Sequence, residues 1–536
     1  MLPYTRQMTS HDADYVLAVD LGTGGPKVAL VSAGGDVVGH EVERTGVTLL
    51  PGGGVEQDPA DWWRAVSAAA KRLLARGLVP LDRIVGIACT AQWFGTVAVD
   101  RDGNHLANAI IWMDARGGRY ARRITRGGPI TVSGYGAGRL MRWLRVTGGV
   151  PSRTGKDPIG HILFIQNEWP EVYRRTYKFL EPVDYLNYRL TGIMAASYDT
   201  ITGHWLTDNR DLRRVHYDRQ LIAWSGIDPG KLPDLRPTGS LLGAITPEIA
   251  REFGLRRDVQ VVTGTPDTES AAIGSGAVGD FQPHLYIGTS SWLTCHVPFK
   301  KVDLAASITS LPSGIPGKYM VATEQDVAGG CLNVLRDQII WADDGLSTAP
   351  PPADAFEALN RVAASVPPGS GGLIFTPWLN GERTPVENHL IRGGFFNQSL
   401  ATTRAHMVRA VFEGVALNTR WMHATVERYT KRRLDDINFI GGGANSDLWS
   451  QIHADVLGRR IRQTEEPRLA NARGAAFTAL VALGYSTFDD IPRRVRIKRT
   501  YEPNPANRRL YDDMFREFVN IYQCNKKIYA RLNAER

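Results

Sequence analysis

Cysteine is scarce in this sequence, and long apolar runs are absent. Only four of the 536 residues are cysteines, and no two lie close enough to suggest a metal site or a redox pair: Cys89, Cys295, Cys331 and Cys524. No apolar stretch reaches the roughly 18 residues of a membrane span, and no apolar run follows the charges near the start, as in a signal peptide. We therefore expect a cytoplasmic protein without a membrane partner, with residues 1–13 forming a loose tail.

Signatures of nucleic-acid binding are also missing, although the net charge is +8. Arginine and lysine cluster at residues 116–126 and 493–499, but neither cluster has interleaved aromatic residues, zinc-ligand spacing or an RNA-binding motif. A positive balance also helps an enzyme to gather anionic phosphate ligands. We therefore read both clusters as solvated surface and expect no nucleic-acid partner.

The length implies more than one domain. A single hydrophobic core usually stops growing at roughly 250 to 300 residues, so 536 residues imply at least two domains. Hydrophobic residues make up 43% and charged residues 22% of the chain, as in ordinary globular proteins. We expect a tail, an N-terminal domain, a C-terminal domain and a basic, helical extension, with the boundaries 1–13, 14–257, 258–490 and 491–536.

The first part of the chain alternates between strands, hairpins and a helix. Glycine-rich turns separate short apolar runs, which is typical of strands and tight hairpins. A helix is expected from Pro59 to about Arg76, with Asp58 as its N-cap. This alternation predicts an α/β domain with a mixed sheet. The predicted strands are residues 15–20, 27–32, 37–43, 83–90, 95–100 and 106–112.

A second unit of strand and glycine turn repeats the first. Residues 285–291 form another apolar run that enters Gly-Thr followed by small residues, as residues 15–24 do. The spacing between Gly22 and Gly288 is too long for a solenoid repeat and suits a duplicated domain. The sequence therefore predicts two related lobes that face one cleft. Further elements are predicted at residues 403–428, 437–440, 447–457, 473–483 and from 508 onward.

Three turns in which a strand runs into glycine are suited to phosphate binding. They lie at Gly22, Gly288 and Gly441. Phosphate binding needs exposed backbone N–H groups with no side chain in the way. Neither a P-loop nor a dinucleotide-binding fingerprint is present. We expect the first two turns to hold a triphosphate from opposite sides, and the third to support the nucleoside end.

Two aspartates end apolar strands next to glycine-containing turns. Asp20 directly precedes the first turn, where a carboxylate would serve Mg²⁺ directly or through water, although it could also cap the turn. Asp267 follows the apolar run of residues 261–266. Phosphoryl transfer to an alcohol needs a carboxylate that orients the hydroxyl and accepts its proton. The sequence therefore makes Asp267 the candidate catalytic base.

Together these motifs resemble the FGGY carbohydrate kinases of the actin and hexokinase superfamily, and are most similar to the xylulokinase-like branch. The resemblance covers about residues 15–484, and the motifs occur in the order found in that family. It is carried by Asp20-Leu21-Gly22-Thr23 with Lys27, Trp112-Met113-Asp114-Ala115-Arg116, Asp184-Tyr185-Leu186, Arg189-Leu190-Thr191-Gly192, Ile287-Gly288-Thr289-Ser290, Gly381-Glu382-Arg383-Thr384-Pro385, Gly441-Gly442-Gly443-Ala444-Asn445-Ser446 and Ala454-Asp455-Val456-Leu457-Gly458.

The resemblance implies an α/β fold of two ribonuclease-H-like (actin-like ATPase) domains with a cleft between them. It implies ATP as the phosphoryl donor, Mg²⁺ held by Asp20 and Asp267, and Asp267 as the base, and it allows a homodimer. The implied nucleotide-binding residues are Gly22, Thr23, Gly24, Lys27, Gly288, Thr289, Ser290, Gly442, Gly443 and Asn445. The implied substrate-binding residues are Gln92, Trp93, Phe94, Trp112, Asp114 and Thr268.

One position departs from the family pattern. Xylulokinases carry Gln-Met-His-Gly where this chain has Gln92-Trp93-Phe94-Gly95. Phe94 therefore replaces a histidine that hydrogen-bonds the sugar, and an apolar ring leaves a sugar hydroxyl unpaired. The aromatic rings could stack on the carbon face of a polyol or a less polar substrate, or could simply close the floor of the cleft. Both readings stay open.

We therefore expect an ATP-dependent kinase that phosphorylates a hydroxyl of a ketose, a polyol or a related sugar. The alternatives are a kinase for another acceptor, such as glycerol, ribulose, erythritol or an aldonate, and a non-catalytic actin-like nucleotide switch. The element from Trp112 to Arg116 argues against the switch, because it belongs to the sugar side of the family's site.

Overall fold

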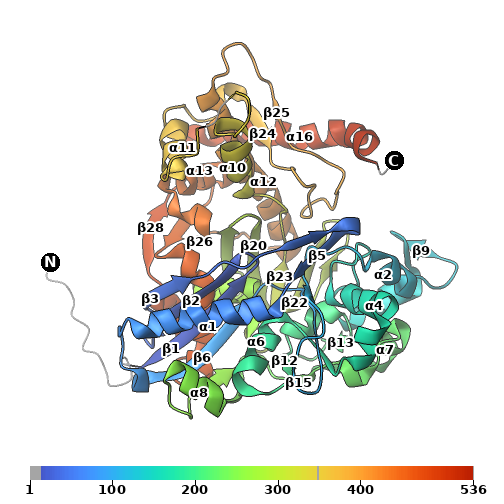
Figure 1. Cartoon of the computed structure of the whole chain (residues 1–536). Coiled ribbons are helices and arrows are strands. Elements are labelled where there is room, and N and C mark those ends of the chain that lie inside the picture. The colour runs from blue at the N-terminus through green and yellow to red at the C-terminus, as the bar shows by residue number, and fades with distance from the viewer. Residues whose placement is uncertain (1–13, 347–348, 535–536) are drawn as a thin grey trace.

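The structure, a computed structural model, describes residues 14–346 and 349–534. Two lobes follow each other along the chain, the N-terminal lobe below and the C-terminal lobe above in Figure 1. The predicted tail of residues 1–13 lies outside the described residues. Among the described residues, no helix is both long and apolar enough to cross a bilayer.

The N-terminal lobe is built on a mixed, seven-stranded sheet in which β18 pairs with one end of β6. Strand β2 pairs antiparallel with both β1 and β3, whereas β6 runs parallel with both β1 and β17. The side chains of β1 are almost all buried, as the apolar run predicted. The members are β16 (Leu241–Ala244), β17 (Gln260–Val262), β6 (Ile84–Ala91), β1 (Tyr15–Gly22), β2 (Gly25–Ser32), β3 (Val37–Val42) and β18 (Thr265–Pro266).

The C-terminal lobe has an eight-stranded mixed sheet. Its strand β19 pairs antiparallel with β20 and parallel with β26, and β26 runs parallel with β27. In order across the sheet, the members are β21 (Val302–Asp303), β22 (Ile308–Pro312), β23 (Tyr319–Ala322), β20 (Ser291–Val297), β19 (Pro283–Ile287), β26 (Ile437–Ile440), β27 (Ile461–Thr464) and β28 (Ile497–Tyr501).

The two sheets share one topology at their centres. The run β3-β2-β1-β6-β17 in the first sheet corresponds to β23-β20-β19-β26-β27 in the second, with the same sequence of antiparallel and parallel pairings. The repeated Gly-Thr unit therefore belongs to two halves of the same design, as the spacing predicted. In each half a hairpin precedes the parallel strands, so the two phosphate-loop candidates occupy equivalent places.

The long helices begin where local signals predict. Helix α1 (Pro59–Ala75) starts after Asp58, whose side chain accepts a hydrogen bond from the Ala60 N–H. Helix α12 (Arg404–Thr430) starts with a capping box between Thr403 and His406. Helix α13 (Asp447–Leu457) is capped by Ser446. These bounds confirm the predicted helices to within a few residues.

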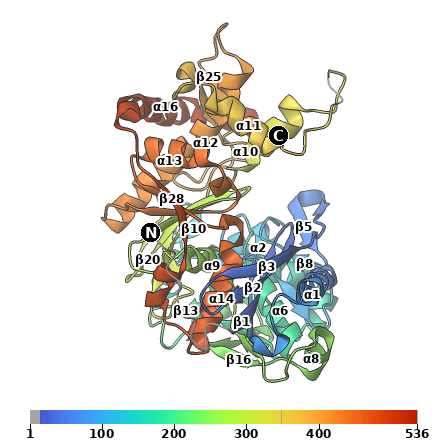
Figure 2. The same ribbon diagram turned by 90° about the vertical axis from the view of Figure 1, so that its left-hand side faces the viewer.

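Two helices join the lobes by packing against each other. Helix α9 (Asp267–Gly274) crosses α14 (Ala470–Ala482) so closely that a Cβ on Gly274 or Gly474 would collide with the backbone of the other helix. Helix α14 comes from the C-terminal half of the chain but packs on the first sheet, where Figure 2 shows it beside β1 and β2. Ala271 of α9 contacts Trp292 and Ile440 of the second sheet. The start of α9 therefore lies where both sheets meet.

The remaining elements surround these sheets. Strands β17 and β18 come shortly after residue 257, where a domain boundary is predicted, and both pair with β6 of the first sheet. The predicted domain boundaries stay a prediction. The helix predicted from residue 508 is confirmed as α16 (Arg508–Asn533), which packs on the C-terminal lobe. The predicted hairpin at 95–112 is present only as two isolated bridges.

The other helices are α2 (Gly118–Thr125), α3 (Ala137–Val146), α4 (Pro158–Glu168), α5 (Pro170–Arg175), α6 (Pro182–Thr191), α7 (Arg219–Ser225), α8 (Pro247–Phe253), α10 (Gly330–Val334), α11 (Ala355–Ala364) and α15 (Ile491–Arg494). The other strands are β4 (Thr48–Leu50), β5 (Gly54–Gln57), β7 (Val97–Val99), β8 (Ala109–Ile110), β9 (Thr131–Val132), β10 (Tyr135–Gly136), β11 (Lys178–Leu180), β12 (Ala195–Ser197), β13 (Thr207–Asp208), β14 (His216–Tyr217), β15 (Asp234–Arg236), β24 (Ile374–Thr376) and β25 (Gly394–Phe396).

Candidate active site

The hairpin of β1 and β2 carries an ion pair at its tip. Asp20 lies opposite Lys27 in the strand register, and the Lys27 Nζ is 2.8 Å from the Asp20 carboxylate. Asp20 is 1% exposed, and its charge is the main cause that raises the pKa of Lys27 above its usual value. Gly25, in the turn between them, has a φ of +124°, and a Cβ there would collide with the Glu43 carbonyl. The turn therefore brings a carboxylate and a fixed positive charge beside open backbone.

Two predicted substrate-binding residues hold the first phosphate loop. The Thr23 hydroxyl donates to Gln92 Oε1 over 2.8 Å and accepts a hydrogen bond from Trp112 Nε1 over 3.1 Å. The Gln92 amide also donates to Gln57, whose own amide donates to the Thr23 carbonyl. In this structure the polar atoms of Gln92 and Trp112 thus position Thr23, and their contact with a sugar stays a prediction.

Asp114 binds other groups of the protein with both carboxylate oxygens. One oxygen accepts from the Val55 backbone N–H over 2.8 Å, and both accept from Arg116. Arg116 also pairs with Glu56. Asp114 therefore fixes the chain around Trp112, and its predicted contact with the substrate is untested.

Asp267 begins α9 at the junction of the two sheets. The preceding strand β18 pairs with β6 next to β1, so Asp267 emerges beside Asp20. Burial is the main cause that raises the pKa of Asp267 to about 7, and the negative charges of Asp20 and Glu324 act in the same direction. Its carboxylate accepts one hydrogen bond, from the Thr268 backbone N–H. A half-buried carboxylate whose pKa lies near neutral pH is suited to act as a general base.

The residues after Asp267 differ in their contacts. The Thr268 hydroxyl is buried and has no hydrogen-bond partner among the described residues, and its contact with the substrate stays a prediction. Glu269 is fully buried and accepts a hydrogen bond from the Gly314 backbone, with burial holding its pKa well above the usual range. Glu269 is therefore part of the packing between the lobes.

The hairpin of β19 and β20 presents the second glycine turn. The Gly288 N–H donates to the Ser290 carbonyl across the turn, and the Gly288 and Thr289 carbonyls accept from the backbone that leads into α10. This arrangement confirms a compact Gly-Thr-Ser turn at a strand end. The binding of phosphate by Gly288, Thr289 and Ser290 remains a prediction.

The third glycine turn follows β26. The Gly441 N–H donates to the Pro467 carbonyl, and the 3₁₀ turn η8 (Gly442–Asn445) leads into α13. Gly442 and Asn445 are exposed, and no atom lies within 4 Å of the position that a Cβ on Gly442 would take. The turn is therefore free to approach a ligand, as its predicted nucleoside-side role requires.

The aromatic residues of the predicted sugar side pack together. The Phe94 ring lies 4.6 Å from the Trp93 ring and 6.3 Å from the Trp205 ring, and Trp93 Nε1 donates to the Thr200 carbonyl. Phe94 has a φ of +61°, which is uncommon for a residue with a side chain. Both rings are half-buried, so they form an apolar wall that offers no hydrogen bond from Phe94.

A cross-lobe cluster of charges was missed at this site by the sequence prediction. Arg383 of the C-terminal lobe pairs with Glu324 and Asp326, and its guanidinium lies 5.7 Å from the centre of the Trp112 ring of the N-terminal lobe. Lys156 is half-buried beside the same three charges. These residues lie in loops that carry no local pattern, and only the Gly-Glu-Arg-Thr-Pro segment pointed to Arg383.

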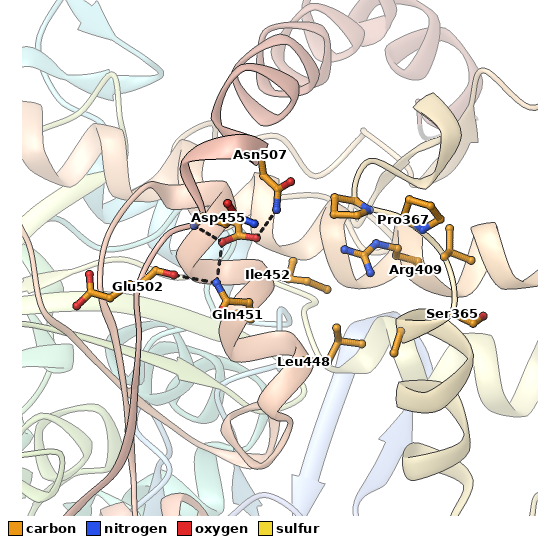
Figure 3. Close-up of a pocket in the computed structure, with 13 residues that line it drawn as sticks. Ser365, Pro367, Arg409, Leu448, Gln451, Ile452, Asp455, Glu502 and Asn507 are labelled. Atoms are coloured by element: carbon orange, nitrogen blue, oxygen red, sulfur yellow. Dashed lines mark hydrogen bonds between the residues drawn. The ribbon is translucent and has the colours of Figure 1, made fainter.

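A separate pocket of about 600 Å³ opens in the C-terminal lobe, away from these residues. Figure 3 shows Asp455 of α13 at its edge, bound by Gln451 and Asn507. Asp455 also accepts from the Asn504 backbone, so it ties α13 to the C-terminal extension. None of the predicted site residues lines this pocket.

Comparison with protein families decides the relationship. A model of the N-terminal domain of the FGGY family of carbohydrate kinases matches residues 15–274, and a model of its C-terminal domain matches residues 285–483. The chain belongs to the FGGY family of carbohydrate kinases. It is therefore a sugar phosphotransferase of the family that uses ATP as its phosphoryl donor.

Relatives of the FGGY chain are similar over nearly their whole length. A xylulose kinase of Bacillus subtilis is 27% identical over 528 residues, covering 97% of this chain and 99% of the relative. A xylulose kinase of Staphylococcus epidermidis is 29% identical, covering 97% and 98%. The crystal structure of a xylulose kinase from Rhodospirillum rubrum matches with a TM-score of 0.80 and 26% identity, covering 96% and 99%. The predicted actin-like ATPase fold of two domains is confirmed.

The FGGY site has carboxylates suited to a divalent cation. Asp20 and Asp267 are close enough for their charges to interact, and carboxylate oxygens are preferred ligands of Mg²⁺. No group of three or more histidine, cysteine or acidic side chains that could hold an ion by itself occurs in the described part of the chain. Two carboxylates beside a phosphate loop fit an ion that is shared with nucleotide phosphates.

Proposed function

We propose that this FGGY kinase transfers the terminal phosphoryl group of MgATP to a hydroxyl of a ketose such as xylulose, with Asp267 as the catalytic base. The observation that carries the proposal is the place of Asp267, which is half-buried and close enough to Asp20 of the first hairpin and Tyr286 of the second for their charges to interact. The names of the relatives support a ketose as the acceptor.

The proposed mechanism divides the work between the residues around Asp267. Asp267 orients the acceptor hydroxyl and takes its proton as the oxygen attacks phosphorus. Lys27 offsets negative charge on the phosphates, and the glycine turns at Gly22 and Gly288 let the backbone of both hairpins approach the phosphate tail. Asp20 and Asp267 would hold Mg²⁺, which neutralises phosphate charge when bound. Packing of the lobes around α9 excludes water, so that ATP is not hydrolysed wastefully.

The acceptor has a second candidate class. Phe94 and Trp93 form an apolar wall where a hydrogen bond to a ketose is expected, and such a wall favours the carbon face of a polyol. The actin-like switch without a sugar substrate is not favoured by the family membership.

An acceptor panel tests the proposal. Coupled ADP release should be measured with ketoses, polyols and aldonates, using wild type and Asp267→Asn. We expect release that depends on one acceptor class in wild type and is lost in the variant, while the variant still binds ADP. Turnover retained by Asp267→Asn would remove Asp267 from the mechanism, and release that no acceptor stimulates would contradict the kinase assignment.

Two further features belong to the proposal. All four cysteines are free and three of them are buried, which supports a reducing, cytoplasmic location. A homodimer is proposed from the family resemblance, and sedimentation velocity would test it. A monomer at micromolar concentration would contradict it.

A further inference from the structure

The two phosphate-loop hairpins place different side chains at equivalent positions. Asp20 lies two residues before Gly22, and Tyr286 lies two residues before Gly288. Both belong to the central strand of their sheet, and each faces a cross-strand partner, Lys27 for Asp20 and Trp292 for Tyr286. Side chains alternate along a strand, so equivalent positions point toward equivalent places. Tyr286 therefore lies relative to the second glycine turn as Asp20 lies relative to the first.

The Tyr286 ring is held firmly in this direction. It stacks on Trp292 with ring centres 3.9 Å apart and an angle of 6° between the planes. Trp292 is in turn fixed by a 3.1 Å hydrogen bond from its Nε1 to His284, which is buried. A Cβ added to Gly288 would lie 2.5 Å from the Tyr286 Oη. The hydroxyl therefore rests directly on the glycine of the second loop, which must lack a side chain to leave room for it.

The Tyr286 hydroxyl has a donor proton, and no residue in 14–346 or 349–534 accepts a hydrogen bond from it. The charges of Lys27, Asp20, Asp267 and Arg468 all act on it. Burial is the main cause that raises the pKa of Tyr286 to about 12; the two carboxylates act in the same direction, and Lys27 and Arg468 act against it. The phenol therefore stays protonated at neutral pH. A neutral donor facing a cation and a carboxylate pair is suited to a phosphate oxygen between them.

We propose that the Tyr286 hydroxyl donates a hydrogen bond to the terminal phosphoryl group of the bound nucleotide, from the side opposite Lys27. This inference rests on the proposed function and adds a residue to it. The first hairpin supplies a metal-binding carboxylate and a cation, and the second supplies a neutral donor. Asp20 and Asp267 would hold Mg²⁺, and the Tyr286 hydroxyl would orient the phosphoryl group.

Nucleotide binding to Tyr286→Phe separates this contact from a structural role. The substitution keeps the stacked ring and removes only the hydroxyl. Calorimetry with Mg²⁺ should show that AMP-PNP binds about tenfold or more weakly, because a lost hydrogen bond to a charged group costs at least that factor. ADP, which lacks the terminal phosphate, should bind as it does to wild type. We expect kcat to fall about tenfold as well, with the KM of the sugar unchanged.

A matched control is Tyr188→Phe, which removes a phenol that donates to the Asp102 carbonyl on the surface. It should leave both affinities unchanged. AMP-PNP binding that is unaffected by Tyr286→Phe would overturn the inference, and so would an equal loss for ADP and AMP-PNP, because that result means a change of loop shape. If Asp267→Asn is inactive while Tyr286→Phe binds AMP-PNP normally, this inference alone fails. Retained turnover in Asp267→Asn, or no AMP-PNP binding by wild type, overturns the proposed function instead.

Discussion

The two hairpins at the centre of the molecule share a backbone and differ in chemistry. In the first, Asp20 and Lys27 face each other as an ion pair. In the second, the equivalent positions hold the stacked rings of Tyr286 and Trp292. The duplicated topology fixes where a side chain points, whereas the side chain decides what it can bind. The first hairpin therefore carries charged groups that can bind phosphate and a metal ion. The second carries a fixed aromatic ring whose hydroxyl can donate a neutral hydrogen bond.

Of the changes within the two hairpins, the largest effect should come from removing the cation of the first. Lys27→Met is expected to lower kcat by on the order of a hundredfold, because a preorganised donor at the developing phosphate charge is lost. Lys27→Arg keeps the charge and should retain most of the activity. Steady-state kinetics with saturating ATP and sugar measure both variants. A fall in kcat of less than about threefold in Lys27→Met would contradict the charged role given to the first hairpin.

The protonation of Asp267 should dominate the pH profile. A base with a pKa of about 7 in the free enzyme is ionised only above that value, so kcat/KM for the sugar should fall about tenfold per pH unit below about 7. It should reach a plateau at higher pH. A profile that stays flat from about pH 5.5 to 8.5 would contradict the assignment.

Protonation of Asp267 also affects stability. Activity should rise with pH, whereas the stability that this proton contributes should fall. Its folded-state pKa lies above the ordinary value of 3.8, so the folded protein binds the proton more tightly than the unfolded one. The stability contributed by this proton is present below about pH 3.8 and is lost as the pH rises through about 7. Without nucleotide, Asp267→Asn should therefore gain thermal stability relative to wild type as the pH rises from about 5 to about 8. A constant difference would contradict the buried position.

The close approach of the Tyr286 hydroxyl to Gly288 can be tested by adding a methyl group to this glycine. Gly288→Ala places a methyl group 2.5 Å from the Tyr286 Oη, which should lower the free energy of unfolding by about 1 to 3 kcal/mol. In a Tyr286→Ser background, where the ring is absent, the same Gly288→Ala change should cost less. Gly138→Ala on the surface of α3, where nothing lies within 4 Å, is the control. Chemical denaturation of the two single variants, the double variant and the control measures this difference, and an equal cost of Gly288→Ala in both backgrounds would mean that Tyr286 is not the neighbour that matters.

The smallest effect is expected where the lobes touch outside the hairpins. Arg383→Met removes the contact with the Trp112 ring and leaves Glu324 and Asp326 unpaired, which should raise the KM of the sugar several-fold with a smaller change in kcat. Arg383→Lys keeps the charge but loses the planar group, so it should fall between wild type and Met. An unchanged KM in Arg383→Met would show that this cluster is purely structural.

Local signals predicted much of this architecture. The N-cap residues Asp58 and Ser446 place α1 and α13 correctly, because capping depends on neighbours in sequence. The repeated Gly-Thr turn predicted two related halves, and the matching strand orders confirm them. These features are encoded within a few residues or by a simple repeat.

Contacts between distant segments could not be predicted. Gln92 and Trp112 bind Thr23 through hydrogen bonds that span 69 and 89 residues. The charge of Glu324 acts on Asp267 only because the lobes are folded against each other. The packing of α14, from the C-terminal half of the chain, on the first sheet and against α9 likewise depends on how the halves assemble. No local pattern announces such contacts, since they depend on the tertiary arrangement.

A crystal structure with Mg²⁺, AMP-PNP and a ketose would test the central claim most directly. We predict that the terminal phosphate lies between Lys27 and Tyr286, and that an Asp267 oxygen lies within about 3 Å of the acceptor hydroxyl. A terminal phosphate bound away from either hairpin, or an acceptor hydroxyl out of reach of Asp267, would contradict the account.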